Sequence, residues 1–424
     1  TLTAFEVHRA GTNCRVDMVL TMFIVCALYA LYNWWEMGCR WLPWVAVLCM
    51  SGATLTKGPV GIVLPCFVMF VFMLFTAWQR GKLSGAMVWK TTYKLFLSAV
   101  LASVLPLLWY WAAYRQGGEQ FLGLVLDENV GRFLGKMKAV THENPWHYNL
   151  LMLISGWLPW TLPMLLSLFA LPWKKWSRHL KTTGWASIWT HLVERARKAD
   201  AVQVFTWLSL LLILFFYCIP KSKRGVYLLP CYPFMGVLIV EYTIWLVKRS
   251  LLPIRFYIGF LSVVGFVLTA TLVILRAGLI PDSIFQGKHA WENIQMLHAL
   301  SHGSINFGDI LMALMPLLAA CLGFMVLLRR DACFITRHNV LSSTIITLLI
   351  FLSFDGFYKP KVMGAQSLKP LAMQVKQKAD GEPVFALTTI NKREVGDDVM
   401  RLYGVDFYLG DSVRQLDVDR PRKG

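Results

Sequence analysis

The chain has 424 residues, of which 56% are hydrophobic and 14% aromatic, and its formal net charge is +18. Soluble globular domains are not this apolar, whereas polytopic membrane proteins are. The basic residues lie mostly in short loops between apolar runs, which is typical of membrane topology, and no nucleic-acid-binding motif is present. We therefore expect no nucleic-acid partner. Among nine cysteines there is no Cys-x-x-Cys pair, so neither a disulfide framework nor a zinc site is indicated.

The apolar runs predict an all-α polytopic membrane protein with about ten transmembrane helices. Several of these runs are shorter than the ~20 residues that a full crossing requires. The second and third are joined by a tight reversal at Thr56-Lys57-Gly58-Pro59. The predicted spans are 17–35, 41–56, 60–78, 92–114, 149–173, 201–219, 226–247, 254–276, 309–329 and 339–356.

Lysine and arginine are unevenly shared between alternate loops. The loops richer in these residues, above all 174–200, should be cytoplasmic. Loop 115–148 and the C-terminal tail then face outward. Within 174–200, Trp185, Ile188, Trp189 and Leu192 recur at helical spacing, which predicts an amphipathic helix lying on the membrane.

The outer loop 277–308 predicts a second amphipathic helix, and it contains His289, His298 and His302. Three histidines indicate a metal site only if they converge, so ordinary surface histidines are the favoured interpretation.

The character of the sequence changes after about residue 357, where spans stop and charge rises. Residues 368–379 and 397–403 predict helices, and 383–390 and 405–409 predict strands. We therefore divide the chain into a membrane domain, 1–356, and a small outward-facing α/β domain, 357–424.

The longest polar interval in the first half is 127–148. It mixes acids, bases and two histidines with apolar residues, and disordered spacers are usually poor in apolar and aromatic residues. We interpret it as a structured loop over a site at the membrane surface. Its charged and titratable residues include Asp127, Glu128, Arg132, Lys136, Lys138, His142, Glu143 and His147.

Two groups of cations on the outer side run against the usual charge distribution. Lys57 lies at the tip of the reversal, and Lys221, Lys223 and Arg224 form a cluster between two spans. Cations gathered on this side suit an anionic ligand such as a phosphate. Contact with lipid headgroups is the alternative explanation.

Asp17, at the head of the first span, also has two interpretations. It could cap the helix and complement the helix dipole. Alternatively, it could be a carboxylate that faces a polar cavity, as ionisable groups inside membranes tend to do.

Four motifs together suggest a family. They are Arg15-Val-Asp17-Met-Val-Leu-Thr, Leu55-Thr-Lys57-Gly-Pro, His142-Glu-Asn-Pro-Trp-His-Tyr148 and Tyr227-Leu-Leu-Pro-Cys-Tyr-Pro233. In this order the set resembles bacterial glycosyltransferase family 39, relatives of protein O-mannosyltransferases and of the lipid A aminoarabinose transferase. The resemblance covers residues from about 10 to 240.

The resemblance implies a GT-C membrane fold and a glycosyltransferase. Such an enzyme moves a sugar from a polyprenyl-phosphate donor to a lipid or protein acceptor at the periplasmic face of a bacterial inner membrane. Loop 115–148 and the C-terminal domain would then be periplasmic, and membrane lipids would surround the spans.

Residue by residue, the resemblance gives Asp17 and Lys57 catalytic roles. It places Lys221, Lys223, Arg224 and Arg132 at the donor phosphate. It assigns Glu128, His142, Glu143, His147 and Tyr148 to a mobile loop that closes on the carrier. No cofactor is certain. In some relatives a loop histidine helps to hold a divalent metal, so His142 is the candidate ligand.

The sequence departs from the family in one respect. Members carry further helices before the region equivalent to Thr1, with an acidic catalytic residue in an outer loop, so we expect this chain to be part of something longer. Two other classes remain open. They are a ligase or polymerase of surface polysaccharide, and a transporter or flippase of a lipid-linked sugar, although no convincing internal repeat supports the latter.

Overall fold

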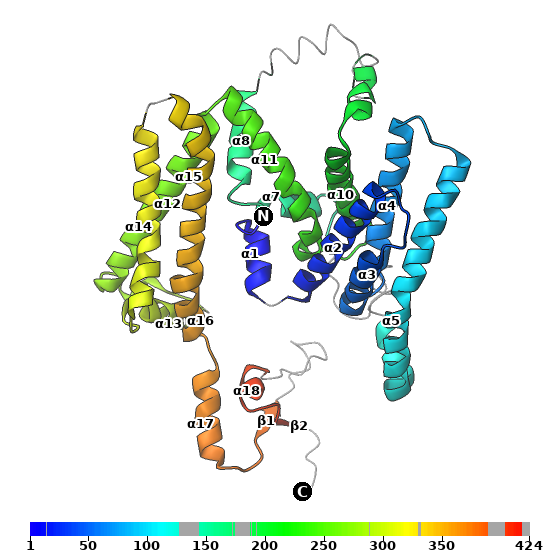
Figure 1. Ribbon diagram of the computed structural model, residues 1–424. Coiled ribbons are helices and arrows are strands. Elements are labelled where there is room, and N and C mark those ends of the chain that lie inside the picture. Colours follow the sequence, from blue (N-terminus) through cyan, green and yellow to red (C-terminus); the bar gives the residue numbers. More distant parts are fainter. Residues whose placement is uncertain are drawn as a thin grey trace. The chain divides into compact units, whose positions relative to one another are not determined.

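The computed structural model describes residues 1–13, 15–126, 144–171, 173, 187, 189–191, 193–287, 289–329, 332–388 and 403–417. The chain divides into two units, each of which is described by itself (Figure 1). Unit 1 comprises Thr1–Ile258 with Arg329–Thr344, and unit 2 comprises Gly259–Leu328 with Ile345–Gly424.

Unit 1 is built from helices. Its central helices are α2, α3, α4 and α10, with the 3-10 helix η2 packed against α2 and α10. The helices of unit 1 are α1 (Phe5–Thr12), α2 (Val16–Glu36), α3 (Trp44–Lys57), α4 (Val60–Gln79), α5 (Gly85–Leu126), α7 (Tyr148–Gly156), α8 (Thr161–Ala170), α10 (Ala201–Cys218), η2 (Gly225–Cys231) and α11 (Tyr232–Arg249), followed by the start of α12 (Leu252–Arg276) and the first part of α15 (Ala332–Ser353).

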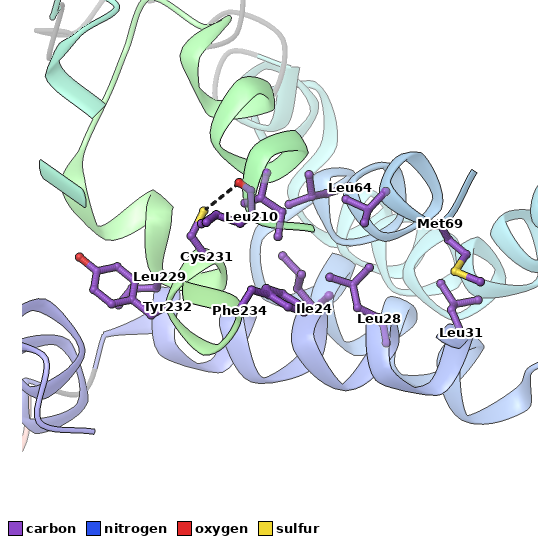
Figure 2. Packing of buried hydrophobic residues seen from close by; sticks show 14 of the residues in the cluster. Ile24, Leu28, Leu31, Leu64, Met69, Leu210, Leu229, Cys231, Tyr232 and Phe234 are labelled. Carbon is purple, nitrogen blue, oxygen red and sulfur yellow. Dashed lines mark hydrogen bonds between the residues drawn. The ribbon is translucent and has the colours of Figure 1, made fainter. Parts of the chain in front are cut away.

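The core of unit 1 lies where α2 faces α4, α10 and η2. Figure 2 shows side chains of α2, among them Ile24 and Leu28, beside Leu64 of α4, and all three are fully buried. Burying a residue of this size contributes roughly 1.5–3 kcal/mol when the alternative is water. In a bilayer the gain comes from close packing, because lipid is as apolar as the core. This core therefore fixes α2 against α4.

Eight helices of the described residues are long and apolar enough to cross a membrane, and a bent pair brings the number to nine. The polytopic membrane architecture predicted from the sequence is confirmed. Two predicted spans are not single helices of full crossing length. The run 41–56 forms α3, which has 14 residues and falls short of a full crossing length. The run 149–173 is broken into α7 and α8, which meet at 104°.

The break between α7 and α8 has a local cause. Residues 157–160 form a turn, with Gly156 before it and Pro159 within it. Glycine is unfavourable inside a helix, and proline removes a backbone donor and clashes with the preceding turn. Trp157 in this turn is 2% exposed and stacks on Tyr232, with ring centroids 5.4 Å apart. The buried Trp157 ring therefore anchors the turn to α11, while Leu158 in the same turn is exposed.

Unit 2 begins within α12. Its membrane helices are the rest of α12, α14 and the later part of α15, which continues through the π-helix η4 into α16, so the last span reaches Ala365 and not 356 as predicted. Helix α13 confirms the amphipathic helix predicted in 277–308. The remaining elements are η3 (Asp282–Ile284), α13 (Ala290–Ser301), α14 (Phe307–Leu328), α15 (Ala332–Ser353), η4 (Phe354–Tyr358), α16 (Lys359–Ala365), α17 (Lys369–Ala379), β1 (Phe385–Thr388), α18 (Tyr403–Tyr408) and β2 (Arg414–Asp417).

The end of the chain has α/β character, as predicted. Helix α17 and strand β1 lie within the predicted ranges, and β1 pairs in parallel with β2, with Phe385 opposite Arg414. The strand predicted over 405–409 is wrong, because residues 403–408 form α18, which packs on α17. The strand lies further on, at Arg414–Asp417. Most of the predicted helix 397–403 lies outside the described residues.

The amphipathic helix predicted in 174–200 is described only in part. Residues 193–198 are helical, and Gln79 at the end of α4 donates hydrogen bonds to the carbonyl oxygens of Ala196 (2.7 Å) and Ala199 (3.2 Å). The start of α10 is therefore fixed to the end of α4.

Candidate functional site: a paired lysine beside an apolar cavity

Lys57 is the last residue of α3, at a tight reversal into α4. The amide of Gly58 donates a 2.7 Å hydrogen bond to the carbonyl oxygen of Thr54. Gly58 itself has φ 83°, which ends α3, and Pro59 starts the next turn. Gly61 lets the two helices approach closely, because a Cβ at this position would lie 2.5 Å from backbone atoms of Ala53 and Thr54. The predicted reversal is present.

Asp17 binds Lys57 directly. The Asp17 carboxylate in the first turn of α2 forms an ion pair with the Lys57 ammonium, and the two side chains are 15% and 28% exposed. The N-cap of α2 is Arg15, and no side chain caps the helix. Asp17 therefore does not cap α2 through its side chain, although it lies in the first turn of that helix, and its role at a polar cavity stays a prediction.

An aromatic ring completes the surroundings of the lysine. The Nζ of Lys57 lies 4.2 Å from the ring centroid of Tyr227 in η2, which is a cation–π distance. The Tyr227 ring in turn lies 5.9 Å from that of Tyr217 at the end of α10. A carboxylate and an aromatic face from different helices therefore hold one ammonium group.

Lys57 lines a cavity of about 620 Å³, which we call the Lys57 cavity. Its walls come from the α3–α4 reversal, α5, the end of α10 and the segment before η2. Among the described residues, Lys57 is the only charged side chain in its lining. The aromatic lining residues are Trp109, Tyr110, Phe121, Phe216, Tyr217 and Tyr227.

A bend in α5 shapes one wall of this cavity. Gly118 has φ 56° and ψ −148°, a backbone conformation that residues with a Cβ rarely adopt. Beyond the bend, Phe121 lies 6.2 Å from Trp109 and 6.4 Å from Tyr110, measured between ring centroids. The wall is therefore aromatic on both sides of Gly118, and a mostly apolar cavity with one cation suits a ligand that joins an apolar chain to an anion.

The cationic cluster at 221–224 is split by the fold. Lys221 and Arg224 are exposed, whereas Lys223 is 6% exposed and donates a 2.7 Å hydrogen bond to the carbonyl of Pro220. None of the three lines the Lys57 cavity, although their neighbours Pro220 and Ser222 do. Lys223 is therefore engaged in holding the loop, while Lys221 and Arg224 are accessible to an anion.

The last residues of the predicted outer loop are attached to this cluster. The backbone N–H of Asn144 donates to the carbonyl oxygen of Lys221 (3.5 Å), and the side-chain amide of Asn144 donates to the carbonyl oxygen of Lys223 (3.2 Å). The side-chain amide of Asn149 donates to the carbonyl oxygen of Tyr217 (2.7 Å). His147 is exposed and precedes α7, and Tyr148 is the first residue of α7. The other predicted loop and phosphate residues, Glu128, Arg132, His142 and Glu143, lie outside the described residues.

We expect Asn149→Ala to destabilise the protein. Asn149 is 1% exposed, and its loss leaves the Tyr217 carbonyl without this donor, which costs about 1–3 kcal/mol. Thermal unfolding in detergent should show a lower melting temperature for this variant. Asn13→Ala, at an exposed turn, is the control and should match the wild type. An unchanged melting temperature for Asn149→Ala would show that the hydrogen bond is not structural.

No group of three potential metal ligands is found where the structure describes the chain. Of the three histidines near α13, His298 contacts Asp282 (2.9 Å), His289 contacts Glu292 (3.2 Å) and His302 contacts Ser301 (2.7 Å). The rings of His298 and His302 lie 5.6 Å apart between centroids, and the interpretation of the three as surface histidines stays a prediction. His142, the candidate ligand, is not among the described residues.

Comparisons with known proteins agree with the motifs. The chain is 27% identical over 222 residues to an undecaprenyl phosphate-alpha-4-amino-4-deoxy-L-arabinose arabinosyl transferase of Pseudomonas aeruginosa (strain UCBPP-PA14), an alignment that covers 51% of this chain and 34% of that protein. It is 26% identical over 226 residues to an uncharacterized protein of Aquifex aeolicus, covering 53% and 38% respectively. The chain thus spans well under half the length of these relatives. No protein-family model matches it.

Among solved structures, the chain is similar to ArnT from Cupriavidus metallidurans bound to undecaprenyl phosphate. The TM-score is 0.57 at 18% sequence identity, and the match covers 99% of this chain and 65% of that one. The same protein in the apo state gives a TM-score of 0.51. The resemblance predicted from the four motifs is therefore confirmed, and the chain has the GT-C-type membrane fold of ArnT.

Proposed function

We propose that this chain forms the donor-binding part of a membrane glycosyltransferase. The enzyme would take a sugar, such as a pentose, an aminoarabinose-like sugar or a hexose, from a polyprenyl-phosphate donor. The observation that carries the proposal is the single cation of the Lys57 cavity, fixed by Asp17 and Tyr227 beside apolar walls. An apolar cavity that presents one ammonium group suits a lipid joined to a phosphate.

The reaction places a defined demand on this cation. An oxygen of the acceptor attacks the anomeric carbon of the sugar, the bond between that carbon and the phosphate oxygen breaks, and polyprenyl phosphate leaves with the electron pair. An ammonium group beside the phosphate stabilises the negative charge that develops there. A hydroxyl acceptor also transfers its proton to a base, whereas a phosphate acceptor is already ionised and needs none.

The relatives support the donor class. The relative from Pseudomonas aeruginosa is an undecaprenyl phosphate-alpha-4-amino-4-deoxy-L-arabinose arabinosyl transferase, and the ArnT structure contains undecaprenyl phosphate. By this analogy the acceptor is a lipid of the lipid A type, with a protein acceptor as the alternative, and the reaction takes place at the periplasmic face of the inner membrane. Loop 115–148 and the domain 357–424 would then be periplasmic.

Lys57 and Asp17 would act at the reaction centre in this proposal. Lys221 and Arg224 would meet the donor phosphate from the loop before η2, together with Arg132. Lys223 would keep that loop in place. Glu128, His142, Glu143, His147 and Tyr148 would belong to the loop that closes on the carrier.

The test is sugar transfer by membranes from cells that express the gene encoding this chain. Radiolabelled polyprenyl-phosphate sugars are supplied, and label is followed into lipid and protein. Label moving to an acceptor, with release of polyprenyl phosphate, supports the proposal. If the donor crosses the membrane with its sugar bond intact, the chain is a flippase and the proposal fails.

We expect Asp17→Asn to reduce the transfer rate by about a hundredfold. The Lys57 ammonium would be misplaced at the reacting centre, and a displacement of about 1 Å can lower a rate by that factor. The amide keeps the size of the carboxylate but removes the charge that holds Lys57. Initial rates are compared at equal protein levels in the membrane. Asp282→Asn, an exposed carboxylate of unit 2, is the control. Wild-type rates for Asp17→Asn would remove Asp17 from the site.

A further inference from the structure

Three candidate membrane spans end close together in the part of unit 1 that lies away from Lys57. Helix α4 runs for 20 residues, about 30 Å, from the Lys57 reversal to Gln79. The last turn of α2 lies beside α4, because the Trp35 ring is 4.8 Å from that of Phe72. The start of α10 is held there by the hydrogen bonds that Gln79 donates to the segment before it. We call this place the α2–α4–α10 junction.

Two arginines at the junction lie against tryptophan rings. The guanidinium carbon of Arg80, directly after α4, lies 5.0 Å from the ring centroid of Trp35. That of Arg197, in the segment before α10, lies 5.2 Å from the ring centroid of Trp78. Both are cation–π distances, and both arginines are exposed. A ring covers only the flat face of a guanidinium, so the N–H donors in its plane remain accessible to an anion.

Two lysines at the same end of unit 1 differ from these arginines, because they have protein partners. The Lys94 ammonium donates a 2.6 Å hydrogen bond to a backbone carbonyl between α2 and α3, and Lys198 pairs with Glu194 at 2.6 Å. Arg80 and Arg197 form no hydrogen bond or ion pair with any other residue that the structure describes. Their contacts with the rings therefore leave the hydrogen-bonding capacity of both guanidinium groups unused.

The backbone that carries both arginines is fixed. Gln79 directly precedes Arg80. Its side-chain amide donates hydrogen bonds to the carbonyl oxygens of Ala196 (2.7 Å) and Ala199 (3.2 Å), and Arg197 lies between these two acceptors in sequence. A site on ordered backbone loses less conformational entropy when a ligand binds. Both guanidinium groups are therefore presented to a ligand in advance.

The surroundings of the junction favour a lipid as the source of the anion. It lies at span ends, the depth of lipid headgroups, where tryptophans are common. Trp41, whose carbonyl accepts from the Trp34 indole N–H, is 85% exposed, and Trp44 is 58% exposed. Acyl chains can cover such rings while a headgroup reaches the cations. Loop 174–200, which contains Arg197, is predicted to be cytoplasmic, and anionic lipids of that leaflet attract basic segments.

We propose that headgroup phosphates of anionic phospholipids bind the guanidinium edges of Arg80 and Arg197 at the α2–α4–α10 junction. Each guanidinium offers donors to two phosphate oxygens, while the tryptophan ring on its face holds it in place. The site lies away from the Lys57 cavity and does not depend on sugar transfer. Either proposal can therefore fail without affecting the other.

The experiment measures lipid binding to the purified full chain in detergent by native mass spectrometry. The probes are phosphatidylglycerol, with an anionic headgroup, and phosphatidylcholine, with a zwitterionic one. Inorganic phosphate serves as a soluble competitor. The test variant is Arg80→Gln/Arg197→Gln, and Arg80→Lys/Arg197→Lys keeps the charge without the planar fork. Lys369→Gln/Lys376→Gln is the matched control, because it removes two exposed cations of α17 in unit 2.

We expect the wild type to bind phosphatidylglycerol more tightly than phosphatidylcholine. The Arg80→Gln/Arg197→Gln variant should bind phosphatidylglycerol about tenfold more weakly, since two cations near an anionic lipid are lost. The double lysine variant should show intermediate affinity, because an ammonium binds a phosphate as a point charge. The matched control should equal the wild type.

Four results would overturn the proposal. Wild-type affinity for phosphatidylglycerol in the double glutamine variant removes the site. Equal loss in the matched control reduces the effect to net charge. Equal binding of the two lipids, or displacement of phosphatidylglycerol by millimolar inorganic phosphate, shows that an anionic lipid is not what the site selects. If the double glutamine variant does not fold, the double lysine variant carries the test, and its wild-type affinity overturns the contact with the guanidinium edges.

Discussion

Lys57→Ala should reduce sugar transfer by about a hundredfold to a thousandfold, the effect of removing one preorganised group that stabilises developing charge. No other charged side chain lines the Lys57 cavity in the described residues, so no neighbour there can replace it. The measurement is the initial rate of release of polyprenyl phosphate in membranes, at saturating donor and at equal expression.

Two further variants make this prediction specific. Lys57→Arg keeps a cation but changes its shape and reach, and should recover part of the rate. Lys82→Ala removes an exposed lysine after α4 and should leave the rate unchanged. If Lys57→Ala transfers sugar at the wild-type rate, the donor phosphate does not bind at Lys57, and the exposed pair Lys221 and Arg224 becomes the site to test.

Gly61→Ala should have a large structural effect for a single added methyl group. The new Cβ would lie 2.5 Å from the backbone of Ala53 and Thr54, which cannot move as a side chain can. Overpacking of this kind costs about 1–3 kcal/mol or more. Helices α3 and α4 would have to separate at the reversal that carries Lys57. We therefore expect a lower melting temperature together with reduced transfer.

The control for this variant is Gly85→Ala at the start of α5, where an added Cβ meets nothing within 4 Å. Its melting temperature should equal or exceed that of the wild type, since alanine favours helix. If Gly61→Ala unfolds at the wild-type temperature, the close approach of α3 and α4 is not required for the fold.

Periodicity and composition were sufficient to predict the membrane architecture, because long apolar runs have few alternatives to a helix in a bilayer. Periodicity and composition predicted less reliably where an apolar run was too short to decide between a full crossing, a shorter helix and a strand. The run 41–56 is mostly apolar, yet Pro43 and Gly58 limit the helix to Trp44–Lys57. The strand predicted at 405–409 failed because short apolar runs fit helix and strand equally well, and packing on α17 selects the helix.

The sequence singled out individual residues of the candidate site, but it could not predict the contacts between them. Resemblance singled out Asp17 and Lys57, but only the fold shows that they form an ion pair. The role of Tyr227 as a cation–π partner depends on how η2 packs, which spacing cannot give. Asn144 and Asn149 were missed as anchors. The signal available was Asn144 directly before Pro145 and Asn149 three residues after Trp146, since amides near a turn often bond to backbone.

The hydrogen bonds of Asn144 also bear on how many times the chain changes sides of the membrane. Asn144 is held at the C-terminal end of α10, whereas Asp200 caps its N-terminal end. The segment from 144 to 200 therefore returns the chain along the full length of a membrane-crossing helix, however sharply α7 and α8 bend. The same logic applies to α3, because the Asp17–Lys57 pair joins its end to the start of α2. The short helix α3 and the bent pair α7 and α8 thus each bring the chain back across the membrane once, as a single full-length span would. Lys57 shares one membrane face with Asp17, and Lys221 shares one with Asn144.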